Sequence, residues 1–184
     1  MGRLYVSLMH YPVRNKNGET VASAITNLDL HDIARVCRSY GVARYFVVTP
    51  LADQRKLARR ILQHWLAGAG GDYNPQRKEA LALVRVTADL KETCAAIQSA
   101  SGQKPRIIAT SSRGGPDTID FAALRAMQKE ERPCLLAFGT AWGFTDDFLD
   151  EADHLLEPIR GAGEYNHLSV RSAASIILDR LHNP

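Results

Sequence analysis

Two glycine-containing stretches in the last third of the sequence hold the residues best suited to a ligand site. The first reads FGTAWGF, residues 138–144, and follows a predicted strand. Gly139 and Gly143 have no Cβ, so the backbone there could turn sharply or approach a ligand closely. A plain strand-to-helix turn packed by Trp142 accounts for the same residues, so this stretch alone leaves both interpretations open.

The second stretch reads EPIRGAGEYNHLSVRSA, residues 157–173. A proline ends a predicted strand, two glycines loosen the loop, and a polar cluster opens a helix: Tyr165, Asn166, His167 and Ser169. The structural alternative is that Asn166 or Ser169 caps the helix and the neighbouring side chains face solvent. Two such loops in one chain favour a ligand site.

The familiar cofactor and catalytic motifs are missing. The sequence contains neither GxGxxG after the first strand nor GxxxxGK[ST], and it lacks the GxSxG elbow. Its six histidines form no helical metal-binding pair beside a carboxylate, and three widely spaced cysteines suit neither a disulfide framework nor a zinc site. Phosphate-cradle, serine-hydrolase and zinc chemistry are therefore disfavoured.

Composition predicts one compact domain over residues 1–184, with 45% hydrophobic and 23% charged residues. Apolar stretches such as CLLAF at 134–138 are far shorter than the roughly 20 residues that cross a bilayer. The N-terminus lacks the apolar region of a signal peptide, so we expect a cytoplasmic protein with no membrane segment. The net charge of +3 permits an anionic partner without requiring one.

Short β-branched runs alternate with segments of helical period, which predicts a mostly parallel α/β sheet. About six strands are expected, at residues 4–9, 45–49, 83–86, 106–110, 134–138 and 154–158. Four of them carry clustered apolar residues, which indicates helices on both faces of the sheet.

Apolar residues at helical spacing predict five helices, near residues 30–40, 57–65, 90–100, 121–129 and 168–181. Three polar or glycine-rich stretches are expected to be irregular, at residues 11–26, 68–75 and 160–166. Loops at the carboxyl ends of parallel strands are where α/β proteins bind ligands. Both glycine-containing stretches are predicted to lie at that edge.

An N-terminal segment resembles the SpoU-type pattern of the SPOUT class, the α/β-knot methyltransferases that use S-adenosylmethionine (SAM) and mostly modify RNA. The segment reads DLHDIARVCRSYGV, residues 29–42. Arg35 and the pair Gly41 and Val42 match the pattern, whereas Asp29 stands where the family has an Asn.

The two glycine-containing stretches resemble the same class. FGTAWGFT matches the family loop at its turn glycines, with Ala141 at the position of the usual Glu. The last stretch matches at Pro158, Gly161, Leu168, Val170, Ala173, Ala174 and Ile176, while Ser169 and Arg171 replace an Asn and a Ser. The strings NKNGE, TNLDLHDIAR and YNHLSVRSA are also similar to those of a small group of stand-alone bacterial SPOUT proteins described as RNA methyltransferases.

The resemblance implies an α/β fold with a deep C-terminal trefoil knot, a rare exception to the rule against threading. Loops after the last three strands would wrap SAM through apolar contacts and backbone hydrogen bonds, without a metal. The implied cofactor-binding residues are Thr110, Phe138, Gly139, Gly143, Ile159, Leu168, Ser169 and Ala173.

The resemblance also implies a catalytic role for Arg35. An arginine is a poor base, so we expect it to grip a phosphate or stabilise developing negative charge. His31 lies one helical turn earlier and could accept a proton, unless it is an ordinary surface histidine. Asn166 and His167 are expected to contact the acceptor or the cofactor carboxylate, the alternative being a cap. Whether a base nitrogen or a ribose 2′-hydroxyl is methylated stays open.

The family works as homodimers whose active sites borrow residues from the partner, often the motif arginine. A dimer would also cover apolar side chains of the last helix and Trp142. Substrate RNA would be attracted by basic side chains if they cluster, namely Arg14, Lys16, Arg38 and Arg44.

Two other functions fit the sequence. The first is a non-catalytic module with the same knotted fold that holds SAM or RNA, since the positions of the family's Glu, Asn and Ser are altered. The second is a flavodoxin-like or other small-ligand α/β enzyme in which residues 138–144 surround a different cofactor.

Overall fold

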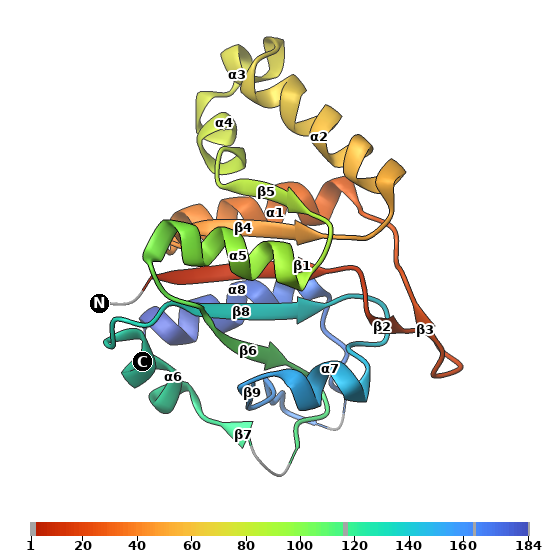
Figure 1. The fold of residues 1–184 in the computed structure, drawn as a ribbon, viewed down its shortest axis with the longest axis vertical. Helices are drawn as coiled ribbons and strands as arrows, with labels where there is room; N and C mark the ends of the chain where they lie inside the picture. The colour runs from red at the N-terminus through yellow and green to blue at the C-terminus, as the bar shows by residue number, and fades with distance from the viewer. Residues whose placement is uncertain (1–2, 116–117, 164, 184) are drawn as a thin grey trace.

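The computed structural model describes residues 3–115, 118–163 and 165–183. Seven strands of this part form one sheet, all of whose neighbours run parallel, in the order β5-β4-β1-β8-β6-β9-β7 (Figure 1). Their bounds are β1 Leu4–Met9, β4 Arg44–Val48, β5 Val84–Thr87, β6 Arg106–Thr110, β7 Thr118–Ile119, β8 Cys134–Gly139 and β9 His154–Leu156.

The six predicted strands are confirmed, each displaced by at most a residue or two at its ends. The expected count was low by one, because β7 is only two residues long and pairs with β9 alone. The stretch 11–26, expected to be irregular, contains a small hairpin of β2 Val13–Arg14 and β3 Thr20–Val21. Its turn is closed by the Asn15 side chain, which accepts from the backbone N–H groups of Asn17 and Glu19.

Helices cover both faces of the sheet, as the unbroken burial of the central strand β1 requires. Side chains of α1 Asn27–Ser39, α2 Ala52–Leu66, α4 Pro75–Leu81, α6 Phe121–Gln128 and α8 Val170–His182 share one core with Val6 and Leu8. Side chains of α5 Leu90–Ser101 and α7 Asp146–Glu151 share the other core, with Tyr5 and Met9. In Figure 1, α5 and α7 lie in front of the sheet, and α1 and α8 lie behind it.

The five predicted helices are confirmed as α1, α2, α5, α6 and α8, and α3, α4 and α7 were not predicted. The stretch 68–75 is not irregular, because it holds α3 Ala69–Tyr73. A Cβ on Gly71 would overlap the Trp65 carbonyl oxygen, so the glycines of α3 serve close packing against α2 rather than flexibility. The predicted apolar stripe of α2 was wrong at Leu57, whose side chain is exposed.

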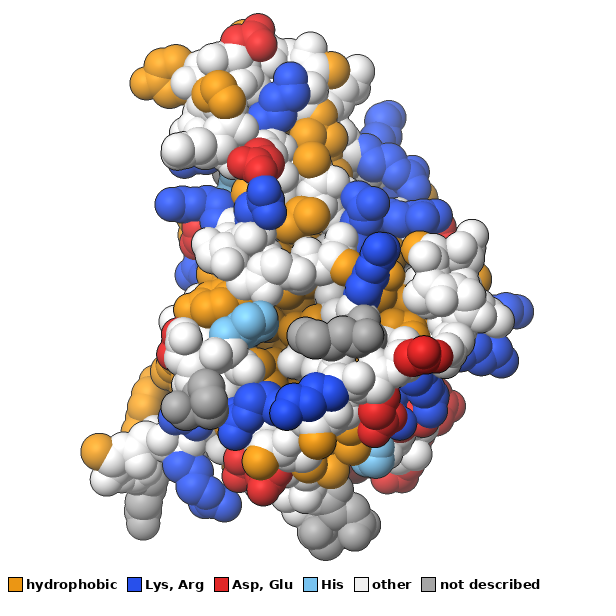
Figure 2. All heavy atoms as spheres, turned by 90° about the vertical axis from the view of Figure 1, so that its left-hand side faces the viewer, with side chains coloured by type: hydrophobic (Ala, Val, Ile, Leu, Met, Phe, Trp, Pro, Cys, Tyr) orange, Lys and Arg blue, Asp and Glu red, His pale blue; other side chains and the backbone are white. Residues whose placement is uncertain are grey.

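The carboxyl ends of β1, β6, β8 and β9 meet at one edge of the sheet, on the right in Figure 1. Figure 2 shows the opposite edge, where Lys and Arg side chains are spread among hydrophobic, acidic and uncharged ones. Within the described ranges, no helix is both long enough and apolar enough to span a bilayer.

Candidate functional site

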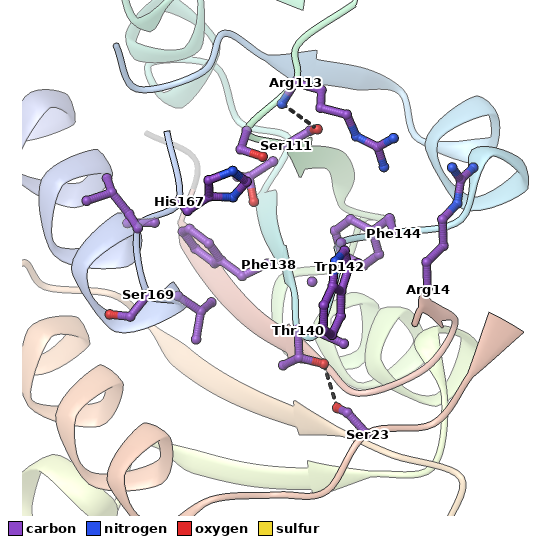
Figure 3. Close-up of a pocket in the computed structure, with 18 of the residues that line it drawn as sticks. Arg14, Ser23, Ser111, Arg113, Phe138, Thr140, Trp142, Phe144, His167 and Ser169 are labelled. Atoms are coloured by element: carbon purple, nitrogen blue, oxygen red, sulfur yellow. Dashed lines mark hydrogen bonds between the residues drawn. The ribbon is translucent and has the colours of Figure 1, made fainter. Parts of the chain in front are cut away.

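A cavity of about 880 Å³ opens at the carboxyl edge of the sheet. Its walls come from the β2–β3 hairpin and from the loops after β6, β8 and β9, with the first turns of α1 and α8 closing one side (Figure 3). Phe138, at the end of β8, forms part of its apolar floor and also belongs to the core. The volume lies in the usual range of small-molecule and cofactor sites.

The loop after β8 is held in a tight, unusual conformation. Gly143 has φ +91° and Ala141 has φ 52°, a backbone conformation that residues other than glycine rarely adopt. Two backbone hydrogen bonds tie the loop to the hairpin: Trp142 N–H donates to the Arg14 carbonyl, and Arg14 N–H donates to that of Gly143. A Cβ on Gly139 would lie 3.2 Å from Phe144 N, so the start of the loop packs closely against its end.

The loop after β9 lies against the loop after β6. The Asn166 side chain donates to the Ser112 carbonyl at 2.8 Å, and a Cβ on Gly114 would lie 3.2 Å from Pro158. Between Ile159 and Leu168, the described residues make no backbone–backbone hydrogen bonds with one another or with the rest of the described chain. Their peptide groups are therefore available to a ligand or to water.

Ser169 caps α8, since its side chain accepts from Ser172 N–H at 3.2 Å. The cap fixes the start of α8, whose first turn places Val170 and Ala173 in the cavity wall, and Leu168 lines the cavity directly before the cap. Ser169 therefore acts as the helix cap that the sequence suggested as an alternative. Because it also lines the cavity, the cap does not prevent contact with a ligand.

Ten of the twelve predicted site residues line this one cavity. They are the eight residues expected to bind a cofactor, Thr110, Phe138, Gly139, Gly143, Ile159, Leu168, Ser169 and Ala173, together with Asn166 and His167. They come from three loops that are separated in sequence and meet because parallel strands end at the same edge.

The profile of one protein family, described as SAM-dependent RNA methyltransferase, matches residues 3–183. The chain belongs to this family. The match covers all the strands and loops that build the cavity. It sets aside a flavodoxin-like enzyme and makes SAM the cofactor of the family site.

Two relatives align with almost the whole of this chain but differ in their own length. A protein of Oleidesulfovibrio alaskensis named tRNA (guanine-N(1)-)-methyltransferase is 48% identical over 178 residues, which cover 97% of this chain and 41% of that protein. A protein of Aquifex aeolicus described as uncharacterized is 41% identical over 179 residues, which cover 97% of this chain and 87% of that protein. The chain thus spans about two fifths of the relative that carries an activity in its name.

Among solved structures, the SpoU methyltransferase AviRb of Streptomyces viridochromogenes has the same fold. The TM-score is 0.60 at 17% sequence identity, and the alignment covers 97% of this chain and 58% of that one. The resemblance to the SPOUT class, drawn above from three short motifs, is confirmed by this fold and by the family match.

Arg35 and His31 do not line the cavity of their own chain. Arg35 is exposed, and it follows the cavity residue Asp29 by six positions, which is about 9 Å along α1 and about 240° around it. The His31 ring packs edge-on against Trp65 with centroids 5.3 Å apart. Burial, followed by the nearby Arg77, lowers the pKa of His31. The catalytic roles of both residues stay predictions.

Of the four basic residues expected to attract RNA, Arg14 and Lys16 line the cavity. Arg38 instead pairs with Glu79, and Arg44 donates to the Ala82 carbonyl, both away from the cavity. The cavity also contains residues that were not predicted: Ser23, Thr26, Asp29 and residues 111–113. Residues 111–113, Ser-Ser-Arg, directly follow β6. Their position at the carboxyl end of a strand could have predicted that they line the cavity.

A partly buried hydrogen-bond chain, whose Ser23 and Thr140 line the cavity, links three distant segments. His10 Nδ1 lies 2.8 Å from Ser23 Oγ, which lies 2.6 Å from Thr140 Oγ1 (Figure 3 shows the second bond). Thr140 donates to the Met9 carbonyl. Ser23 must therefore donate to Thr140, and His10 must donate from Nδ1, so the neutral Nδ1–H tautomer completes the chain. Burial lowers the pKa of His10 from 6.5 to about 4.

Acid should therefore weaken the fold through His10. The unfolded chain binds this proton below about pH 6.5 and the folded chain only below about pH 4, so the free energy of unfolding falls between these values. The expected loss is about 3 kcal/mol, complete near pH 4 and absent above pH 6.5. Urea unfolding of wild type and His10→Asn at neutral and acidic pH measures it. Equal pH dependence in the two proteins would contradict the assignment.

Proposed function

We propose that this chain transfers a methyl group from SAM to RNA within the cavity at the carboxyl edge of the sheet. One observation carries the proposal: the loops after β8 and β9, which resemble two segments of the family, converge with the loop after β6 on a single cavity. Family membership supports the same chemistry. The single domain of residues 1–184 and its location in the cytoplasm belong to this proposal.

The residues present suit SAM. An adenine ring needs an apolar slot, and Phe138, Ile159, Leu168 and Ala173 supply apolar wall. The polar edges of the cofactor need donors and acceptors. The Thr110 hydroxyl can provide them, as can the described peptide groups between Ile159 and Leu168, which have no backbone partner among the described residues. When bound, SAM supplies an activated methyl carbon on a sulfonium. The protein has to hold the acceptor at attack distance, which rigid loops do well.

Asn166 and His167 are the proposed acceptor contacts on the chain's own side. The Asn166 amide already donates to the Ser112 carbonyl, so it fixes the loop at the cavity rim and leaves its oxygen as an acceptor. In Figure 3, His167 faces the cavity beside Phe138. An imidazole ring can both donate and accept a hydrogen bond.

Arg35 is proposed to act from a second copy of the chain, because it lies outside the cavity of its own chain. The apolar residues of α8, including Ala174, Ile177 and Leu178, are already buried in the core, so a dimer is not needed to cover them. Leu28 and Leu168 remain exposed near the first turns of α1 and α8. A homodimer that covers them is part of the proposal.

A deep C-terminal knot is also proposed. The loop after β9 is bonded and packed to the loop after β6 through Asn166 and Pro158. The chain then returns through α8, which packs between α1, α6 and β8. This passage supports a chain end threaded through the loop that follows β6.

Transfer RNA is the first substrate to test, because relatives that share 48% and 44% identity are named tRNA (guanine-N(1)-)-methyltransferase. Each of these proteins has more than half of its length outside the match, so the methylated guanine atom is not carried over to this chain. Ribosomal RNA and ribose methylation stay open.

The test is transfer of labelled methyl from SAM into cellular RNA taken from a strain that lacks this protein. We expect label in one nucleoside, identified by mass spectrometry. The matched control is Ala173→Leu, which fills the cavity wall and should abolish both cofactor binding and transfer. A protein that binds S-adenosylhomocysteine yet labels no RNA would instead be the non-catalytic module that the altered family positions suggest.

A further inference from the structure

Trp142 is a largely exposed aromatic residue at the cavity. Its side chain lines the cavity and the residue is 62% exposed. The indole makes no aromatic pair with another described side chain. A tryptophan held in water beside a ligand site offers a flat face to a planar ligand.

The turn that carries Trp142 is held rigidly. Ala141 adopts φ 52° directly before it, a left-handed conformation that non-glycine residues rarely adopt. Thr140 is fixed by Ser23 and by the Met9 carbonyl, and Trp142 N–H is bonded to Arg14. Strain of this kind persists where the surrounding structure enforces it, and it fixes the direction of the following side chain.

Cationic side chains gather at the same mouth. Arg14, Lys16 and Arg113 line the same cavity as Trp142, and in Figure 3 the guanidinium groups of Arg14 and Arg113 lie on the same side of it. Arg14 pairs with Asp146. The Arg113 guanidinium pairs with no carboxylate of the described residues, while its backbone N–H donates to Ser111 Oγ.

The two carboxylates of the cavity are already engaged. Asp29 accepts from the Thr26 hydroxyl and lies 3.6 Å from Arg171, and Glu157 accepts from Phe121 N–H. Neither forms an ion pair with Arg113. The mouth of the cavity around Trp142 therefore favours an anion next to a planar group.

We propose that Trp142 and Arg113 together bind one unpaired RNA nucleotide, whose base stacks on the indole while its phosphate pairs with the guanidinium. Aromatic stacking beside a cationic groove is how proteins hold single-stranded nucleic acid. A base inside a duplex has no free face, so this site selects an unpaired nucleotide. The inference rests on the proposed function, because it supplies the acceptor for the neighbouring cofactor cavity.

The contribution of Arg113 to RNA affinity should depend on the salt concentration and that of Trp142 should not, so the two can be measured separately. Trp142→Ala should weaken binding of a short single-stranded RNA about 5- to 150-fold without changing the slope of log K against log salt. Arg113→Ala should weaken binding and reduce the magnitude of that slope by about 0.7, as expected for one lost phosphate contact. Trp142→Phe keeps an aromatic face and should restore most of the affinity.

Tyr73→Ala and Arg85→Ala are the matched controls. Tyr73 is an aromatic residue that is 90% exposed on α3, and Arg85 is an exposed arginine on β5; neither lines the cavity. Both proteins should bind RNA as wild type does. In a Trp65→Phe background Trp142 is the remaining tryptophan, and single-stranded RNA should quench its fluorescence more than a duplex of the same sequence.

Wild-type RNA affinity in Trp142→Ala would overturn the proposal. So would dissociation of a dimer in that variant, which would mean that a second copy covers the indole. Methyl transfer assayed in parallel separates this proposal from the proposed function. If RNA is methylated while both variants bind it normally, the nucleotide site is wrong and the function stands. If nothing is methylated while both variants lose RNA binding as described, the site stands and the function fails.

Discussion

Arg35→Ala is expected to lower methyl transfer to RNA by about 10²- to 10³-fold, the usual effect of removing one group that stabilises charge in a transition state. Binding of S-adenosylhomocysteine should not change, because Arg35 does not line the cavity of its own chain. Single-turnover transfer of labelled methyl measures the first effect, and calorimetric titration measures the second. Arg38→Ala is the matched control, since Arg38 is an exposed arginine on the same helix that pairs with Glu79.

Mixing two inactive proteins tests whether Arg35 acts from the partner. Arg35→Ala keeps its cavity, and Ala173→Leu keeps its arginine. Half of the randomly re-formed dimers would be mixed, and each mixed dimer would hold one complete site, so the mixture should regain about a quarter of wild-type activity. A mixture that stays inactive would mean that Arg35 acts within one chain or does not act. Normal transfer by Arg35→Ala alone would remove it from the mechanism.

Phe138→Ala is expected to cost about 3–5 kcal/mol of folding free energy and to abolish measurable cofactor binding. Phe138 is 2% exposed, belongs to the core beside α8, and forms part of the cavity floor. Its truncation therefore removes core packing and the apolar surface proposed to face adenine. Urea unfolding and titration with S-adenosylhomocysteine measure the two effects.

Phe46→Ala separates these effects, because Phe46 is equally buried on β4 but packs in the other core and does not line the cavity. We expect a similar loss of stability with cofactor binding kept below the unfolding transition. Equal loss of binding in both variants would show that Phe138 matters only for packing.

The elements that could be predicted from the sequence are those with a local pattern of apolar residues. Apolar runs marked the six longest strands of the sheet, and helical spacing marked the five helices of eight or more residues that cover it, apart from Leu57. The short elements β7, α3, α4 and α7 were missed because two to seven residues carry too little periodicity. The glycines of α3 suggested a loop, yet they are present because α2 packs against them.

The candidate site was predictable where it follows strands, since parallel strands bring their carboxyl ends together. The residues that the β2–β3 hairpin contributes to the cavity could not be predicted, because their positions depend on contacts between distant segments. Ser23 and Thr140, for example, are 117 residues apart and share one hydrogen bond. The position of Arg35 could not be predicted either, since helical spacing defines a face but not what that face meets.

Calorimetric titration of S-adenosylhomocysteine into the wild-type protein and into Ala173→Leu tests the central claim most directly. A cofactor held among Phe138, Ile159, Leu168 and Ala173 predicts one site per chain in wild type, formed without added metal, and no binding when leucine fills the cavity wall. Unchanged binding in a folded Ala173→Leu protein, or none in wild type, would contradict the placement of the cofactor at this edge of the sheet.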